Sequence, residues 1–157
     1  MIKKEKEAVK VICQNKKARH DYELGDRYEA GLVLTGTEVK SLRLGKANLT
    51  DAYVSLHQGE AYLTGLHISP YPWAHFGNHE PLRRRKLLLH RQELKKLYGR
   101  LNEHGYSLIP LRLYFKEGLA KAELALARGK KKHDKRQALK EADAKREMAR
   151  VLRETHK

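Results

Sequence analysis

Two stretches of alternating apolar and polar residues, each turning back at a glycine, most constrain the fold of this chain. Residues 51–68 alternate on both sides of Gln58-Gly59-Glu60, and residues 106–127 alternate on both sides of Lys116-Glu117-Gly118. A period of two gives a strand one apolar face, and a glycine turn between two such strands is typical of a β-hairpin. The sequence therefore predicts two antiparallel hairpins.

The segments around the hairpins predict two more strands and three short helices. A β-branched run at residues 8–13 and a glycine-containing segment at 29–38 favour strands. Helices are expected at 16–22 with Asn15 as N-cap, at 37–43 with Gly45 after its end, and at about 90–104.

About six short strands with glycines at bends favour a sheet closed into a barrel over an open sandwich. The predicted fold class is mainly β with α: a closed oligonucleotide-binding-like β-barrel of about six strands with three short helices. We expect residues 1–127 to form this barrel domain.

The last 30 residues differ in composition and predict a separate basic tail, residues 128–157. They hold 12 Lys and Arg against 5 Asp and Glu, and few large apolar residues. Such a segment is rich in helix formers but cannot bury a core, and an isolated helix is marginal in water. We expect the tail to be disordered alone and helical on a partner.

The net charge of +15 favours a polyanionic partner. Lys and Arg side chains that neutralise phosphates release counterions, so nucleic acid is the expected ligand. The alternative is a basic protein with no nucleic-acid role. The run Arg83-Arg84-Arg85-Lys86 is interpreted as a phosphate clamp rather than solvated surface, since adjacent like charges repel one another.

Several functional classes find no support in the sequence. It contains no Walker loop, no Gly-x-Gly-x-x-Gly and no Gly-x-Ser-x-Gly. His75 and His79 are four residues apart without further ligands at metal-binding spacing, and Cys13 is the lone cysteine. We therefore expect no enzyme activity, metal or cofactor. Without an 18-residue apolar run or a signal peptide, no membrane association and a cytoplasmic location are expected.

Six ordered motifs resemble one family. They are Asn15-Lys16-Lys17-Ala18-Arg19-His20-Asp21-Tyr22, Glu29-Ala30-Gly31-Leu32, Gly36-Thr37-Glu38-Val39-Lys40-Ser41-Leu42-Arg43, Gly45-Lys46-Ala47-Asn48, Arg85-Lys86-Leu87-Leu88-Leu89-His90 and Gly129-Lys130-Lys131-Lys132-His133-Asp134-Lys135-Arg136. The chain is similar, from about residue 8 to its end, to the SsrA-binding protein family, also called small protein B.

That resemblance implies a function. The family's proteins are non-enzymatic adaptors that bind the tRNA-like part of transfer-messenger RNA, in place of an anticodon arm. They bring it to stalled ribosomes for trans-translation, and the tail folds in the decoding region and the empty messenger channel. Alanyl-tRNA synthetase and elongation factor Tu are implied as indirect partners, through the RNA.

The matching positions give the predicted site residues. Glu29, Leu89 and Lys121 are the barrel positions expected to contact the RNA, by accepting a hydrogen bond, packing on an unstacked base and holding a phosphate. The polar and basic surround comprises Asn15, Lys16, Arg19, His20, Lys40, Arg43, Lys46, Arg128, Lys130, Lys131 and Lys132. Ribosome contacts are expected from the tail residues His133, Asp134, Lys135, Arg136, Arg146, Arg150, Val151, Leu152 and Arg153.

A second interpretation is a general single-strand RNA-binding or RNA-processing barrel. Such proteins stack successive bases on exposed aromatic side chains. The chain has only two Phe and one Trp, and most of its eight Tyr fall in alternating strand segments, so few are expected to form a stacking platform.

Overall fold

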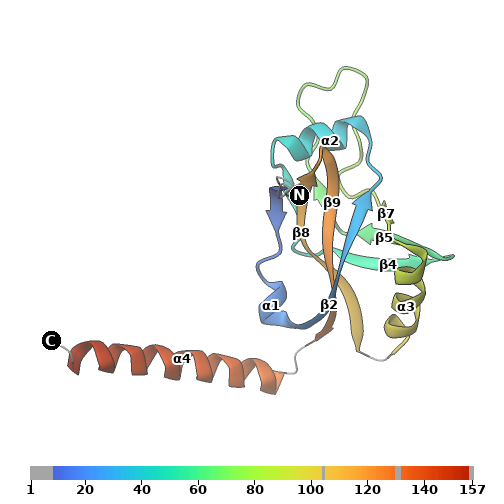
Figure 1. Cartoon of the computed structure of the whole chain (residues 1–157). Helices are drawn as coiled ribbons and strands as arrows, with labels where there is room; N and C mark the ends of the chain where they lie inside the picture. Colours follow the sequence, from blue (N-terminus) through green and yellow to red (C-terminus); the bar gives the residue numbers. More distant parts are fainter. Residues whose placement is uncertain (1–8, 104, 130–131, 156–157) are drawn as a thin grey trace, which may run out of the picture.

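Most strands of this protein belong to one closed sheet. The computed structural model describes residues 9–103, 105–129 and 132–155, with backbone alone for residues 132–139, 141 and 155. Its strands are β1 Val9–Gln14, β2 Tyr22–Leu32, β3 Ala47–Asn48, β4 Tyr53–His57, β5 Glu60–Thr64, β6 His67–Ile68, β7 Arg85–Leu88, β8 Tyr106–Lys116 and β9 Leu119–Gly129. Its helices are α1 Ala18–Asp21, α2 Gly36–Arg43, α3 Arg91–Leu101 and α4 Lys132–Thr155 (Figure 1).

Six strands pair in the cyclic order β8-β4-β5-β7-β2-β9, and β9 pairs with β8 to close the ring. Strand β1 pairs with β8 from outside the ring, while β3 and β6 form a separate two-stranded sheet. The predicted fold class, mainly β with a closed sheet of about six strands, is confirmed. Strand β1 corresponds to the predicted strand at residues 8–13, whereas β7 and the two-residue strands β3 and β6 were not predicted as separate strands.

Both predicted hairpins are present. The β4–β5 turn has Gln58 at φ 49° and Gly59 at φ 79°, and the β8–β9 turn has Glu117 at φ 51° and Gly118 at φ 75°. Two successive residues with positive φ match the right-handed twist of the flanking strands, which is why tight hairpins favour glycine here.

Two boundaries near the N-terminus differ from the prediction. Asn15 does not cap a helix: its side-chain amide donates to the carbonyl of Pro110 at 3.3 Å, and α1 begins only at Ala18. Strand β2 starts at Tyr22 and ends at Leu32, earlier than the predicted strand 29–38. It ends there because α2 starts at Gly36, where the Glu38 carboxylate accepts the Thr35 backbone N–H at 2.9 Å.

The core fills the inside of the ring. Leu63, Leu66, Leu113 and Leu124 are fully buried there, and Leu97 of α3 joins the same cluster. Leucines on a 3.6-residue period give α3 the apolar stripe that the sequence predicted. Within the described ranges, no helix is long and apolar enough to cross a membrane.

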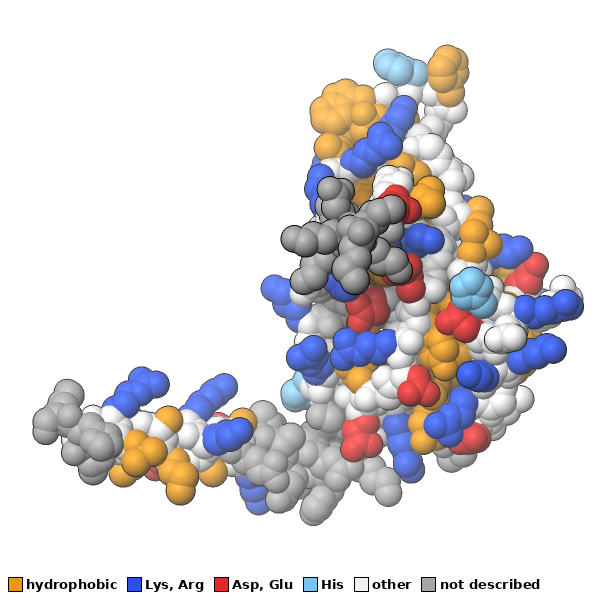
Figure 2. All heavy atoms as spheres, in the orientation of Figure 1, with side chains coloured by type: hydrophobic (Ala, Val, Ile, Leu, Met, Phe, Trp, Pro, Cys, Tyr) orange, Lys and Arg blue, Asp and Glu red, His pale blue; other side chains and the backbone are white. Residues whose placement is uncertain are grey.

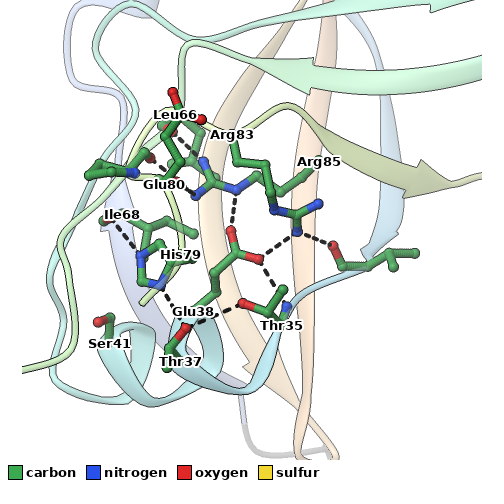
Figure 3. Close-up of polar contacts among 12 residues, drawn as sticks. Thr35, Thr37, Glu38, Ser41, Leu66, Ile68, His79, Glu80, Arg83 and Arg85 are labelled. Carbon is green, nitrogen blue, oxygen red and sulfur yellow. Dashed lines mark hydrogen bonds and ion pairs between the residues drawn. The ribbon is translucent and has the colours of Figure 1, made fainter. Parts of the chain in front are cut away.

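A buried ion-pair cluster joins α2 to the start of β7 and to the segment before it (Figure 3). Glu38 and Arg85 are fully buried, and Arg85 Nε donates to Glu38 Oε2. Arg83 donates an Nη2 hydrogen to the other oxygen of Glu38. Arg85 also donates to the carbonyls of Leu66 and, at 3.1 Å, Pro81. Burial of this kind is tolerated only because each charge has partners.

This cluster corrects the interpretation of residues 83–86 as a phosphate clamp. Arg83 and Arg85 turn inward to Glu38, whereas Arg84 lies 4.2 Å from the Tyr62 ring centroid and Lys86 pairs with Glu60 at 2.9 Å. Successive strand residues point to opposite faces, so four neighbouring cations do not converge on one anion. The repulsion between these neighbouring cations is therefore relieved by carboxylates of the protein itself, Glu38 and Glu60.

The first two residues of the predicted tail, Arg128 and Gly129, complete β9, and the described residues Lys132–Thr155 form one helix, α4, that extends away from the sheet (Figure 1). In Figure 2, most of its Lys and Arg side chains lie along one edge and its hydrophobic side chains along the other. Met148, Val151 and Leu152 are all exposed. The structure thus describes the helical form of the tail, and its formation only on a partner stays a prediction.

Candidate nucleic-acid interface

Strands β2, β9 and β8 carry a row of polar side chains on the outside of the ring. Gly31 of β2 lies opposite Lys121 of β9, which lies opposite Tyr114 of β8. Two residues further along, Glu29 lies opposite Glu123, which lies opposite Arg112. Because side chains two apart share a face, these groups form one surface, called here the β2–β9–β8 face.

Glu29 is held in place from β8. The Tyr114 hydroxyl donates to Glu29 Oε2, and Lys116 Nζ donates to Glu29 Oε1 at 3.5 Å. The Tyr114 hydrogen bond is the main cause that lowers the pKa of Glu29. Partial burial acts to raise this pKa, and the charges of Lys116 and Lys121 lower it further. Burial and the nearby Glu29 carboxylate in turn raise the pKa of the Tyr114 hydroxyl. Glu29 is therefore an ionised, oriented acceptor.

The second acid of the face binds two arginines. Glu123 accepts from Arg27 at 3.0 Å and from Arg112 at 2.6 Å, and the Arg112 guanidinium lies 4.8 Å from the Tyr114 ring centroid. These contacts fix the guanidinium planes while leaving Arg27 half exposed. Arginine held this way presents donors that suit phosphate oxygens.

Gly31 leaves room between an exposed leucine and a lysine. A Cβ placed on Gly31 would lie 3.4 Å from Leu88 Cβ and 3.8 Å from Lys121 Nζ. Leu88, 55% exposed, lies opposite Gly31 in register. Glycine in a strand marks such a close approach. The arrangement offers an apolar contact and a cation side by side.

Helix α1 extends the face. Asn15, Lys16 and Arg19 line a hollow of about 500 Å³ together with residues of the face that include Arg27 and Arg112. A neighbouring hollow of about 640 Å³ is lined by Arg19, Arg27 and Arg128 among others. The structure thus brings several predicted residues into one region: Asn15, Lys16, Arg19, Glu29, Lys121 and Arg128.

Other predicted residues lie elsewhere. Lys40, Arg43 and Lys46 are exposed on and just after α2, at the opposite end of the body from α1 (Figure 1). His20 is on α1 but does not line either hollow, and its Nδ1 lies 2.9 Å from the Asp21 carboxylate. Leu89 is half-buried and packs against the core, so the exposed leucine of this pair is Leu88.

The predicted tail contacts are described only in part. Lys130 and Lys131 lie outside the described residues, and Lys132, His133, Asp134, Lys135 and Arg136 are described only as backbone of α4. Arg146, Arg150, Val151, Leu152 and Arg153 are exposed on the same helix. Glu147 pairs with Arg150 at 3.8 Å.

Some residues of the face were missed from sequence. Arg27, Leu88, Arg112, Tyr114 and Glu123 were not predicted as site residues. The alternating pattern of β8 predicts which of its side chains point outward. The residues of β2 and β9 that lie opposite them depend on the strand register. That register is shifted by the bulges between Leu24 and Arg27 and between Pro110 and Arg112.

The described residues offer no metal site: no group of three or more His, Cys, Asp or Glu is placed to hold an ion. His79, one of the two histidines considered, is buried. Its Nδ1 lies 2.9 Å from the Thr37 hydroxyl and its Nε2 2.9 Å from the Ile68 carbonyl. Burial raises the pKa of Cys13 to about 11 against a hydrogen bond to the Leu113 backbone, so its thiol is protonated.

Comparison with known proteins identifies relatives over nearly the whole chain. The family model described as SmpB protein matches residues 12–154. The SsrA-binding protein of Geobacter metallireducens is 58% identical over 148 residues, which cover 94% of this chain and 97% of that protein. That of Geobacillus thermodenitrificans is 56% identical over 148 residues, covering 94% and 96%. A solved structure described as "tmRNA-SmpB: a journey to the center of the bacterial ribosome" contains a chain that matches with 47% identity and a TM-score of 0.66, covering 81% of this chain and 93% of that one.

Proposed function

The chain belongs to the SmpB protein family, and we propose on that basis that it is an RNA-binding adaptor for trans-translation. It binds the tRNA-like part of transfer-messenger RNA and delivers this RNA to stalled ribosomes. The observation that carries the proposal is the pairing of a polar, cationic face on the ring with a separate basic helix, α4. One molecule thereby offers two surfaces for RNA.

The β2–β9–β8 face supports binding to a folded RNA. Lys121 and Arg27 suit phosphates, and the ionised Glu29 can accept from a 2′-hydroxyl or an exocyclic amine. Leu88 offers an apolar contact for an unstacked base next to Lys121. Asn15, Lys16 and Arg19 extend the same region. Fixed polar groups of this kind recognise shape and 2′-hydroxyls better than a flexible cationic surface does.

The tail supports binding to the ribosome. A helix with exposed arginines on one side and exposed Met148, Val151 and Leu152 on the other suits a groove lined by phosphates and bases. We place it in the small-subunit decoding region and the empty messenger channel, with His133 to Arg136 at its root. Because the proposed partner is the ribosome, we place the protein in the cytoplasm.

The proposed role consists of binding and delivery, not of catalysis. Alanyl-tRNA synthetase and elongation factor Tu would act on the transfer-messenger RNA and reach this protein only through it. The chemistry of alanine charging then stays with the synthetase, and the adaptor contributes by holding the RNA in a competent shape.

Sequencing the RNA that co-purifies with the protein tests the proposal. We expect transfer-messenger RNA to be enriched over messenger and transfer RNA. Competition between a labelled tRNA-like transcript and unlabelled polyU at moderate salt distinguishes the adaptor from a general single-strand RNA-binding protein. Equal competition by polyU, together with no enrichment of transfer-messenger RNA, would contradict the adaptor role.

A further inference from the structure

The segment between β6 and β7 exposes two large aromatic side chains. Trp73 is 63% exposed and Phe76 is fully exposed, although neither lies in a hairpin or helix. Single exposed apolar residues are common, but this one loop exposes two aromatic side chains and carries a third, the half-buried Tyr71, which makes it a candidate binding surface.

This loop is held by many hydrogen bonds rather than left free. The Asn78 side chain accepts from the Tyr71 N–H at 2.9 Å and donates to the Tyr71 carbonyl at 2.8 Å. At one end, Ser41 Oγ donates to the Ser69 carbonyl at 2.7 Å. At the other, His79 bridges Thr37 and the Ile68 carbonyl (Figure 3). The aromatic rings are therefore presented by a fixed backbone, which lowers the entropic cost of binding.

The Tyr71 ring of this loop lies near a cation of α2. Lys40 Nζ is 5.5 Å from the Tyr71 ring centroid, and the Tyr71 and Trp73 rings meet edge to face with centroids 5.5 Å apart. Arg43 and Lys46 are exposed on the same element or just after it. Residues 36–46 and 69–80 hold two acids, Glu38, which is fully buried against Arg83 and Arg85, and the exposed Glu80. The surface therefore combines aromatic faces with an excess of positive charge, since Lys40, Arg43 and Lys46 outnumber the one exposed acid.

The position of this surface connects it to the β2–β9–β8 face. Strand β2 carries Glu29 and Gly31 in its last four residues, and α2 begins four residues after its end. The loop lies beyond α2 at this same end of the body (Figure 1), where Figure 2 shows hydrophobic and Lys or Arg side chains side by side. An RNA bound across the face can continue onto the loop.

We propose that Tyr71, Trp73 and Phe76 form a stacking surface for unpaired bases of transfer-messenger RNA, with Lys40, Arg43 and Lys46 binding the flanking phosphates. Aromatic rings next to a cationic track are the combination that binds unpaired nucleotides, since every base has a face that can stack. The inference rests on the proposed function and adds to it the class of RNA segment that this loop recognises.

Trp73 is the only tryptophan of the chain, so its fluorescence reports directly on the loop. The full-length protein is titrated with a tRNA-like transcript of transfer-messenger RNA that carries its own label. We expect Trp73 quenching to follow the same binding curve as the label. Binding reported by the label with unchanged Trp73 fluorescence overturns the stacking surface and leaves the adaptor role standing. No binding by either probe overturns both.

Substitutions give an independent test. Trp73→Ala and Phe76→Ala should each weaken binding of the same transcript by roughly 5- to 150-fold, the range for loss of one stacked base. The matched control is Leu82→Ala, an apolar residue of similar exposure (57%) later in the same segment and away from the three aromatic residues in sequence, which should leave affinity within about twofold of the wild type. The proposal is overturned if all three substitutions weaken binding equally, or if no substitution weakens it.

Discussion

Arg85 and Glu38 form an ion pair in which both side chains are fully buried. Burial works to raise the pKa of Glu38, but hydrogen bonds from Arg83, the Thr35 N–H and Arg85 outweigh it and hold the pKa at about 2. Burial likewise lowers the pKa of Arg85, and the Glu38 carboxylate opposes that change. The pair therefore ties α2 to β7 only while both groups are charged.

Glu38→Ala should strongly destabilise the fold. It leaves Arg85 buried without its counter-charge, which typically costs about 3–5 kcal/mol. Urea unfolding followed by circular dichroism measures the loss. Glu60→Ala is the matched control, because it removes a carboxylate from the Lys86 pair on the surface and should change the free energy of unfolding little. Similar losses for both variants would contradict a structural role for the buried pair.

The same carboxyl group should make stability depend on acid pH. The folded pKa of Glu38, about 2, lies below its ordinary value of 4.5, so its contribution is complete above about pH 4.5 and is lost as the pH falls toward 2. At about 1.4 kcal/mol for each pH unit, this loss is on the order of 3 kcal/mol.

Glu38→Gln isolates this contribution, since glutamine keeps the shape but binds no proton. Free energies of unfolding measured across this range should fall more steeply for the wild type than for the variant. Parallel curves would show that other carboxyl groups account for the acid sensitivity.

The sequence predicted those features of the fold that depend on local pattern. Alternation and turn glycines identified both hairpins, and the apolar stripe of α3 identified its buried side. The boundary between β2 and α2 was wrong, because Thr35 and Glu38 begin the helix inside a segment that still had strand-like composition. Local capping outweighed β propensity there.

The site was harder to predict because it depends on which strands meet. The basic run at residues 83–86 appeared to be a clamp, since nothing in the sequence shows that Glu38 lies beneath it. Leu89 and Leu88 are neighbours, and the strand phase that exposes Leu88 depends on pairing with Gly31. Long-range register decides both questions, and the sequence motifs do not contain that information.

Gly65 should tolerate no side chain. Its φ is +79°, and a Cβ there would lie 2.7 Å from the Asp51 carbonyl oxygen. Gly118 has a similar φ of +75° with nothing within 4 Å, so it is the matched control for backbone strain alone. Gly118→Ala should cost about 1–2 kcal/mol of stability, and Gly65→Ala clearly more, by thermal or urea unfolding. Equal costs would show that the Asp51 backbone moves aside.

Lys121→Ala should weaken binding of the tRNA-like transcript by about 1–3 kcal/mol and reduce the salt slope by about one. Lys121 lies on the β2–β9–β8 face beside Gly31, where a phosphate can reach it. Lys96→Ala removes an equal charge from the exposed side of α3 and serves as the control. Fluorescence anisotropy at several salt concentrations measures both. Equal slopes for the two variants would indicate diffuse attraction rather than a contact.

Deleting residues 134–157 should separate the two proposed contacts. The β2–β9–β8 face stays intact, so affinity for transfer-messenger RNA should remain within a few-fold of the wild type. Peptide tagging on stalled ribosomes should be abolished, because the helix that would enter the messenger channel is gone. A truncated protein that loses RNA affinity as severely as tagging would contradict this division between body and tail.

A pair of double variants refines that test within α4. Arg146→Ala with Arg150→Ala removes two charges from one side of the helix, whereas Lys140→Ala with Lys145→Ala removes two charges from outside that side. If ribosomal phosphates lie along the arginine side, the first pair should reduce tagging well below the second, with unchanged affinity for the RNA in both. Equal reductions would show that only the total charge of the tail matters, because an oriented helix distinguishes its faces and a disordered chain does not.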